Sequence, residues 1–128
     1  MGESVLPEKS VLVIHITPDL MAAAYELLRL SAPFRSWKLP HPDEVKFGVI
    51  AHKDRYGDHR HWRNVHEIRM SVHKIGSLLT LLKTMGHEMI HQKQVIDGTA
   101  TRAEHNEAFE SLAKLVCKRH CWDYMEFR

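Results

Sequence analysis

The feature that most constrains this chain is the segment His87-Glu88-Met89-Ile90-His91, which reads H-E-x-x-H. It lies in a run from Leu78 to Gln94 whose apolar residues recur at helical spacing. Residues four apart lie one above the other on a helix, so the two histidines can present imidazoles to one metal ion. Catalytic zinc sites use three protein ligands, and imidazole suits zinc. The pattern therefore predicts a zinc ion bound by His87 and His91, with Glu88 as general base toward water.

Helical geometry separates the two histidines from the apolar side of the same helix. At about 100° per residue, His87 and His91 lie opposite the apolar stripe, above Thr80 and Thr84. The stripe consists of Leu78, Leu81, Leu82, Met85 and Met89. With 11 histidines in the chain, H-E-x-x-H can also arise by chance. Its position away from the stripe favours ligands facing a cleft over core histidines.

The rest of the chain predicts a single α+β domain over residues 1–128. This length suits one hydrophobic core. Residues 1–9 are expected to be a loose lead-in, and Lys53–Arg63 a hairpin tip or a long loop. Apolar runs predict strands at 11–16, 45–52 and 65–73. Start and stop residues predict helices from Thr17 to about Leu30, from Ser77 toward Gly98, and over roughly residues 102–119.

The third zinc ligand is expected to be His105, fourteen positions after His91. Thr101 and Glu104 have the spacing of a capping box, which would place His105 in the first turn of the last helix. Two helices joined by a short loop can cross so that this turn faces the middle of the first helix. The alternative is an ordinary surface histidine.

These motifs together resemble the SprT-like family of zinc metallopeptidases, which includes the Spartan-type proteases that digest proteins crosslinked to DNA. The resemblance rests on H-E-x-x-H, on H-x-x-x-F from His105 to Phe109, and on the strand at 65–71. It covers roughly residues 17–118. It implies a small zincin-like domain with three main helices packed on a short β-sheet and H-E-x-x-H on the central helix.

The resemblance also implies roles for individual residues and an activity. His87, His91 and His105 would bind zinc, Glu88 would be the general base, and Phe109 would pack so as to fix the His105 turn. The implied activity is hydrolysis of peptide bonds in a protein substrate, with DNA as a further partner and repair of DNA–protein crosslinks as the setting.

Two departures and two alternatives stand beside this interpretation. Asn106 occupies a position that is often glycine in the family, and the C-terminal zinc-ribbon cysteines of some members are absent.

One alternative function is that of a non-peptidase zinc hydrolase acting on nucleic acid. The wide gap between His91 and His105 argues against it. The other is a nucleic-acid-associated binding protein with a structural zinc site, which would not need Glu88.

A basic and aromatic segment from His52 to Lys74 is the candidate nucleic-acid surface. Cationic side chains can contact phosphates, and an aromatic ring can stack on an unpaired base. The alternative is a solvated hairpin. The candidate residues are Lys53, Arg55, Arg60, Trp62 and Arg63.

Two further features of the sequence each allow more than one interpretation. A group that stabilises the oxyanion is expected, and the candidates are Tyr56, His73, Tyr124 and Arg69. Cys117, His120 and Cys121 suggest either a second metal site or half-buried cysteines near a helix end.

The sequence shows no signal peptide or membrane span, which predicts a cytoplasmic, nucleoid or nuclear protein without a membrane partner.

Overall fold

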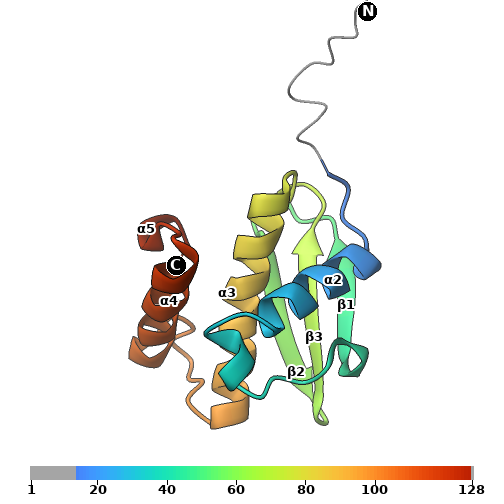
Figure 1. Ribbon diagram of the computed structural model, residues 1–128. Helices are drawn as coiled ribbons and strands as arrows, with labels where there is room; N and C mark the ends of the chain where they lie inside the picture. The colour runs from blue at the N-terminus through green and yellow to red at the C-terminus, as the bar shows by residue number, and fades with distance from the viewer. Residues whose placement is uncertain (1–13, 128) are drawn as a thin grey trace, which may run out of the picture.

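The computed structural model describes residues 14–127 and has an α+β architecture, as the sequence predicts (Figure 1). The helices are α2 (Pro18–Arg29), α3 (Leu78–Asp97), α4 (Glu107–His120) and α5 (Tyr124–Phe127). The strands are β1 (Val45–Ile50), β2 (Gly57–Trp62) and β3 (Val65–Ser71). Two 3₁₀ turns, η1 (Phe34–Ser36) and η2 (Pro42–Glu44), connect α2 to β1.

The three strands form one mixed sheet in the order β1-β3-β2. β1 runs parallel to β3, and β2 runs antiparallel to it. The β2–β3 hairpin turns through Arg63 and Asn64, which both have positive φ, as a two-residue type I′ turn requires. The segment Lys53–Arg63 therefore contains an edge strand. Of the strand expected at 11–16, residues 11–13 lie outside the described range, and 14–16 form no strand.

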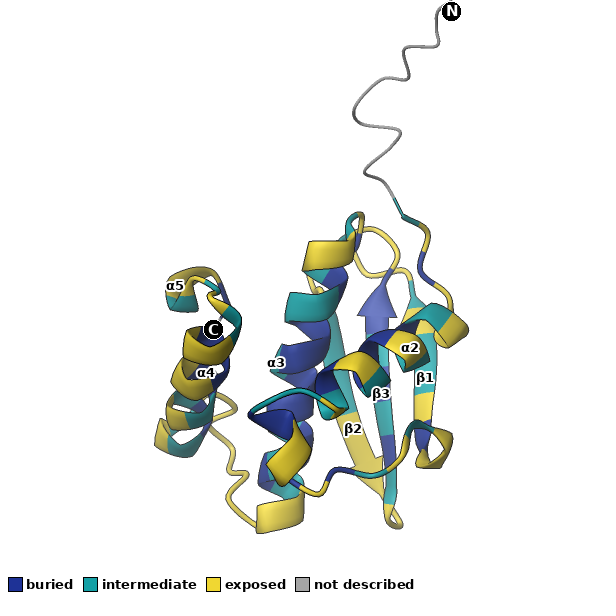
Figure 2. Ribbon diagram, viewed as in Figure 1, coloured by how far each residue is buried: buried dark blue, intermediate teal, exposed yellow. Residues whose placement is uncertain are grey.

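The helices divide into two groups around α3. α2 and α3 lie on one face of the sheet, and α4 with α5 lies on the side of α3 away from α2 (Figure 1). The middle turns of α3 are buried from several sides (Figure 2). The expectation that all three main helices pack on the sheet is therefore wrong for α4, which packs mainly against α3 and α5.

Local signals place both ends of α3. Ser77 Oγ accepts a hydrogen bond from the Thr80 amide at 3.1 Å, and Gly98 closes the helix with φ of 75°. Thr17 caps α2 in the same way, as predicted. None of the helices in residues 14–127 has the length and apolar character that a membrane span requires.

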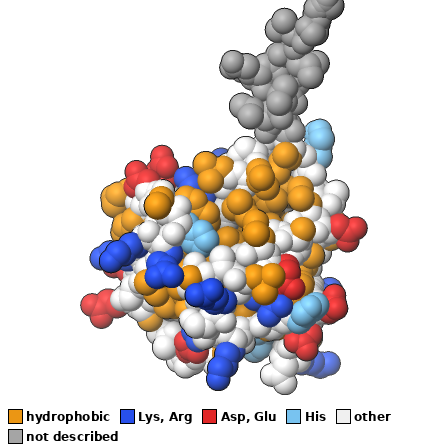
Figure 3. Space-filling view, in the orientation of Figure 1, with side chains coloured by type: hydrophobic (Ala, Val, Ile, Leu, Met, Phe, Trp, Pro, Cys, Tyr) orange, Lys and Arg blue, Asp and Glu red, His pale blue; other side chains and the backbone are white. Residues whose placement is uncertain are grey.

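The apolar stripe of α3 is confirmed except at its first turn. Leu81, Met85 and Met89 are fully buried, but Leu78 is 54% exposed because the first turn of α3 is left uncovered. Exposed apolar side chains gather on the surface where α2 and the start of α3 lie (Figure 3). The exposed large apolar side chains of α2 with its C-cap and of the first turn of α3 are Leu27, Leu30, Leu78 and Leu79.

Candidate metal centre

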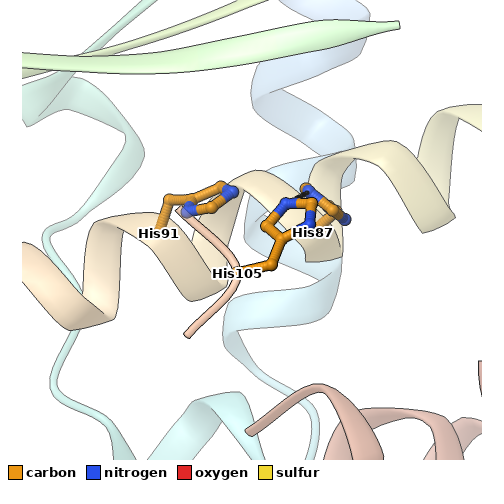
Figure 4. Close-up of side chains that lie close together, drawn as sticks. All are labelled: His87, His91 and His105. Carbon is orange, nitrogen blue, oxygen red and sulfur yellow. Dashed lines mark hydrogen bonds between the residues drawn. The ribbon is translucent and has the colours of Figure 1, made fainter. Parts of the chain in front are cut away.

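His87, His91 and His105 meet in space. The first two lie one turn apart on α3, and His105 approaches them from the loop between α3 and α4 (Figure 4). One ligand atom from each histidine lies within 4.8 Å of the other two. Within residues 14–127, no other three histidine, cysteine or acidic side chains bring ligand atoms this close together.

The separation of two of the ring nitrogens suits a small tetrahedral cation. His87 Nε2 and His105 Nε2 are 3.1 Å apart. Two nitrogens bound to tetrahedral zinc at about 2.0–2.1 Å lie about 3.3 Å apart. Three imidazoles leave a fourth position open, which is the donor set of catalytic rather than structural zinc sites. The residues present therefore fit zinc.

Phe109 forms the floor of this cluster. Its ring is fully buried in the first turn of α4. The ring centroid lies 4.3 Å from that of His105, 4.7 Å from His91 and 4.9 Å from His87. Phe109 thus packs beneath all three histidines and limits the orientations available to their rings.

Burial keeps the two α3 histidines uncharged. Burial is the main cause that lowers the pKa of His87 to about 4. It also lowers the pKa of His91 to about 3, with the His87 and His105 rings adding to the shift. Neutral imidazole is the form that binds metal, so both residues are ready to act as ligands at neutral pH.

Glu88 lies in the same cavity as the histidines. The cavity has a volume of about 860 Å³ and runs between α3, the segment 54–59 and the loop carrying His105. Glu88 is only 5% exposed, and burial is the main cause that raises its pKa to about 8. A cation within a few ångströms would favour the ionised carboxylate, the form that accepts a proton.

The segment that carries His105 differs from the predicted helix start. α4 begins at Glu107 behind Asn106 as N-cap, so His105 precedes the helix instead of lying in its first turn. Thr101 and Glu104 form no capping box, because Thr101 Oγ1 bonds the Ala103 carbonyl. The capping-box prediction was wrong because the loop satisfies Thr101 locally and Asn106 is a better cap.

Asn106 ties this loop to α3. Its Oδ1 accepts hydrogen bonds from the Phe109 amide at 2.9 Å and from Gln94 Nε2 at 2.8 Å. Its Nδ2 donates to the Thr99 carbonyl and to Thr101 Oγ1, each at 3.0 Å. Gln94 is buried on α3, so the network fixes the position of the residue next to His105.

Asn106→Ala is expected to lower the free energy of unfolding by about 1–2 kcal/mol, because it removes a helix cap and the nearer acceptor of buried Gln94, whose Nε2 keeps only the Thr99 carbonyl at 3.5 Å. Zinc affinity should fall as well, since the His105 loop loses its attachment. Urea denaturation of metal-free protein and chelator competition for zinc measure the two effects. Asn106→Asp, which keeps the cap oxygen, should recover most of the stability, and an unchanged affinity in Asn106→Ala would contradict this role of the loop.

The candidate nucleic-acid residues do not form one patch of free cations. Arg60 pairs with Glu67 at 2.6 Å, and Arg55 lies 3.4 Å from Asp58. The Trp62 ring has the Arg60 guanidinium 5.3 Å away and Lys46 Nζ 5.9 Å away. The two remaining candidates lie beyond opposite ends of β2, Lys53 before the strand and Arg63 in the hairpin turn.

Most of the remaining side chains proposed from the sequence lie outside the cavity that contains Glu88. Of the four possible oxyanion-stabilising residues, only Tyr56 lines the cavity beside Glu88. Arg69 is held by Asp58 through two hydrogen bonds of 2.8 and 2.5 Å. Cys117 is buried and Cys121 exposed, and with His120 they form no metal-binding cluster of the kind found at the three histidines.

Two features of the site had no clear sequence signal. His59 on β2 lines the cavity, and its Nε2 lies 2.8 Å from Nδ1 of buried His66 on β3. The Phe127 carbonyl lies 3.0 Å from His87 Nδ1. A backbone acceptor cannot be recognised from the residue type, because every residue has a carbonyl.

No family model matches the chain, and no curated protein matches its sequence.

Proposed function

We propose that this protein is a zinc-dependent metallopeptidase that hydrolyses peptide bonds, with His87, His91 and His105 as ligands and Glu88 as general base. The observation that carries the proposal is that Glu88, a buried carboxyl, shares one cavity with three clustered imidazoles. The family resemblance of H-E-x-x-H and H-x-x-x-F supports the same activity. A site that served only structure would have no use for a carboxyl at this place.

The proposed chemistry divides between the cation and the side chains. When bound, zinc would acidify a water molecule and polarise the scissile carbonyl. Glu88 accepts a proton from the attacking water and donates it to the amide nitrogen as the C–N bond breaks. His87 and His91 stay neutral, so each keeps the lone pair of one ring nitrogen for the ligand role. Tyr56 lines the same cavity, and we assign its hydroxyl the role of donor to the developing oxyanion.

The edge strand β2 suits an extended peptide substrate. β2 is the last strand of the sheet on the side of the cavity, and Gly57, Asp58 and His59 from it line the cavity wall. An edge strand offers unpaired backbone groups to which a peptide can add as a further strand. Recognition through backbone groups would give broad sequence tolerance, which suits a protease acting on varied proteins, DNA-bound ones included.

The test is zinc-dependent cleavage of an unfolded protein such as casein. Purified protein stripped with a chelator should be inactive, and one equivalent of zinc should restore cleavage, with metal content measured on the same samples. Zinc binding without cleavage of any of several unfolded proteins would leave only a structural site. Cleavage of RNA or DNA by the zinc-loaded protein would favour the nucleic-acid hydrolase instead.

A further inference from the structure

The Nδ1 side of the His87 ring is occupied by the backbone of Phe127. The Phe127 carbonyl lies 3.0 Å from His87 Nδ1. A carbonyl oxygen can only accept, so Nδ1 must carry the proton. In the neutral ring, the lone pair is then on Nε2, the atom that lies 3.1 Å from His105 Nε2. The carbonyl thus selects the tautomer that can bind a metal inside the cluster.

The segment Trp122–Phe127 is itself held firmly against α3. Phe127 is 5% exposed, and its ring lies 5.8 Å from Trp122 in a stacked arrangement. Both rings face Gly86, the residue before His87. A Cβ placed there would lie 3.4 Å from Trp122 and 3.6 Å from Phe127, so the glycine lets the aromatic side chains approach α3 closely.

Polar contacts hold the same segment at its exposed side. Glu126 lies 3.7 Å from Lys83, one helical turn before His87 on α3. Asp123 Oδ1 accepts a hydrogen bond from the Met125 amide at 2.8 Å and so begins α5. The carbonyl of Phe127 is therefore placed by packing on α3 and by the start of α5, and its approach to His87 does not depend on one contact alone.

We infer that the segment Trp122–Phe127 is a positioning element for the metal centre, in which the Phe127 backbone carbonyl orients His87 for metal binding. This inference rests on the metal site of the proposed function. Groups that accept the second N–H of a ligating histidine fix its ring and increase its basicity, and their loss typically costs 10–100-fold in metal affinity. Phe127 also lines the cavity, but in this inference it acts through His87.

Phe127→Ala tests the inference, because it removes the buried ring that seats the carbonyl. Zinc dissociation constants, measured by competition with a chromophoric chelator, should rise about 10–100-fold. In metal-free protein, nitrogen NMR of the His87 ring should show the Nδ1–H tautomer in the native chain and a mixture in the variant. Leu28→Ala is the control, since it removes a buried side chain from α2, and its zinc affinity should equal that of the native protein.

A second variant covers the case in which Phe127→Ala does not fold. Replacing the residue at position 128 with its α-hydroxy analogue by semisynthesis turns the Phe127 carbonyl into an ester, a weaker acceptor, with the Phe127 side chain intact. Weaker zinc binding in this protein supports the inference. Unchanged zinc affinity in the ester protein, or an equal loss in Leu28→Ala and Phe127→Ala, overturns it. Absence of zinc binding in the native chain would instead defeat the proposed function.

Discussion

Glu88→Gln is expected to abolish peptide hydrolysis while zinc remains bound. Glutamine has nearly the same shape as glutamate but cannot take the proton from water, and loss of a general base typically costs 10²–10⁴-fold in rate. None of the three ligands changes, so the zinc content should stay at that of the native protein. Initial rates of casein cleavage and metal analysis on the same preparation measure both quantities.

Stability gives this variant an independent check. Glu88 has a raised pKa of about 8 against an ordinary value of 4.5, so the folded metal-free protein keeps a proton that the unfolded chain releases. Its contribution to stability is complete below pH 4.5 and is lost as the pH rises toward 8. Glutamine does not ionise, so the metal-free variant should become the more stable of the two proteins as the pH rises. Glu44→Gln, an exposed change far from the site, should leave rate and zinc content unaltered.

Should Glu88→Gln lose its zinc, the carboxylate would belong to the ligands and the assignment as base would be wrong. Should it retain full activity, the proton would have to pass through another group. His59 is then one candidate, because it is a titratable side chain that lines the cavity and is not itself a candidate ligand.

His105→Ala is expected to cause the second large effect, a loss of zinc affinity. This loss should exceed the 10–100-fold that typically follows removal of a group hydrogen-bonded to a metal ligand. Its ring supplies the Nε2 atom 3.1 Å from His87 Nε2, and no other cysteine, histidine or carboxylate in residues 14–127 completes the cluster. Peptide hydrolysis should fall to background. Because His105 is exposed and outside the core, the metal-free variant should unfold at the same urea concentration as native protein.

The matched control for this variant is His73→Ala, which removes another exposed histidine that does not line the cavity. It should keep the native zinc affinity. A zinc content of one equivalent in His105→Ala, measured after dialysis against a weak chelator, would remove His105 from the ligand set and leave His87 and His91 as an incomplete pair.

The elements near the H-E-x-x-H segment were predictable because their signals are local. Ser77 and Gly98 bound α3, and the polar and apolar sides of this helix follow from its spacing. β2 was not recognised as a strand because Gly57–Trp62 is polar and half-exposed at the edge of the sheet, where pairing with β3 rather than burial fixes its conformation. Apolar alternation cannot report a strand of this kind.

The sequence predicted which residues form the candidate site but not the contacts that hold these residues in place. The spacing of His87 and His91 requires one helix face, and His105 was expected because a third ligand is needed. The sequence did not indicate that Asn106 caps α4 while holding Gln94, because both partners are ordinary amides whose pairing depends on the path of the loop. The role of a backbone group such as the Phe127 carbonyl cannot be inferred from the residue type at all.

The packing of α4 on α3, away from the sheet, would affect how well the metal-free protein resists degradation in a cell. A cation shared by α3 and the His105 loop would crosslink two parts of the chain that otherwise hold together through the packing of α4 and α5 on α3 and through the Asn106–Gln94 hydrogen bond. Loss of the ion would let residues 99–127 separate more often and expose the ring of Phe109. Zinc supply would then govern resistance to degradation as well as catalysis, so molecules that lack metal would be removed before they accumulate.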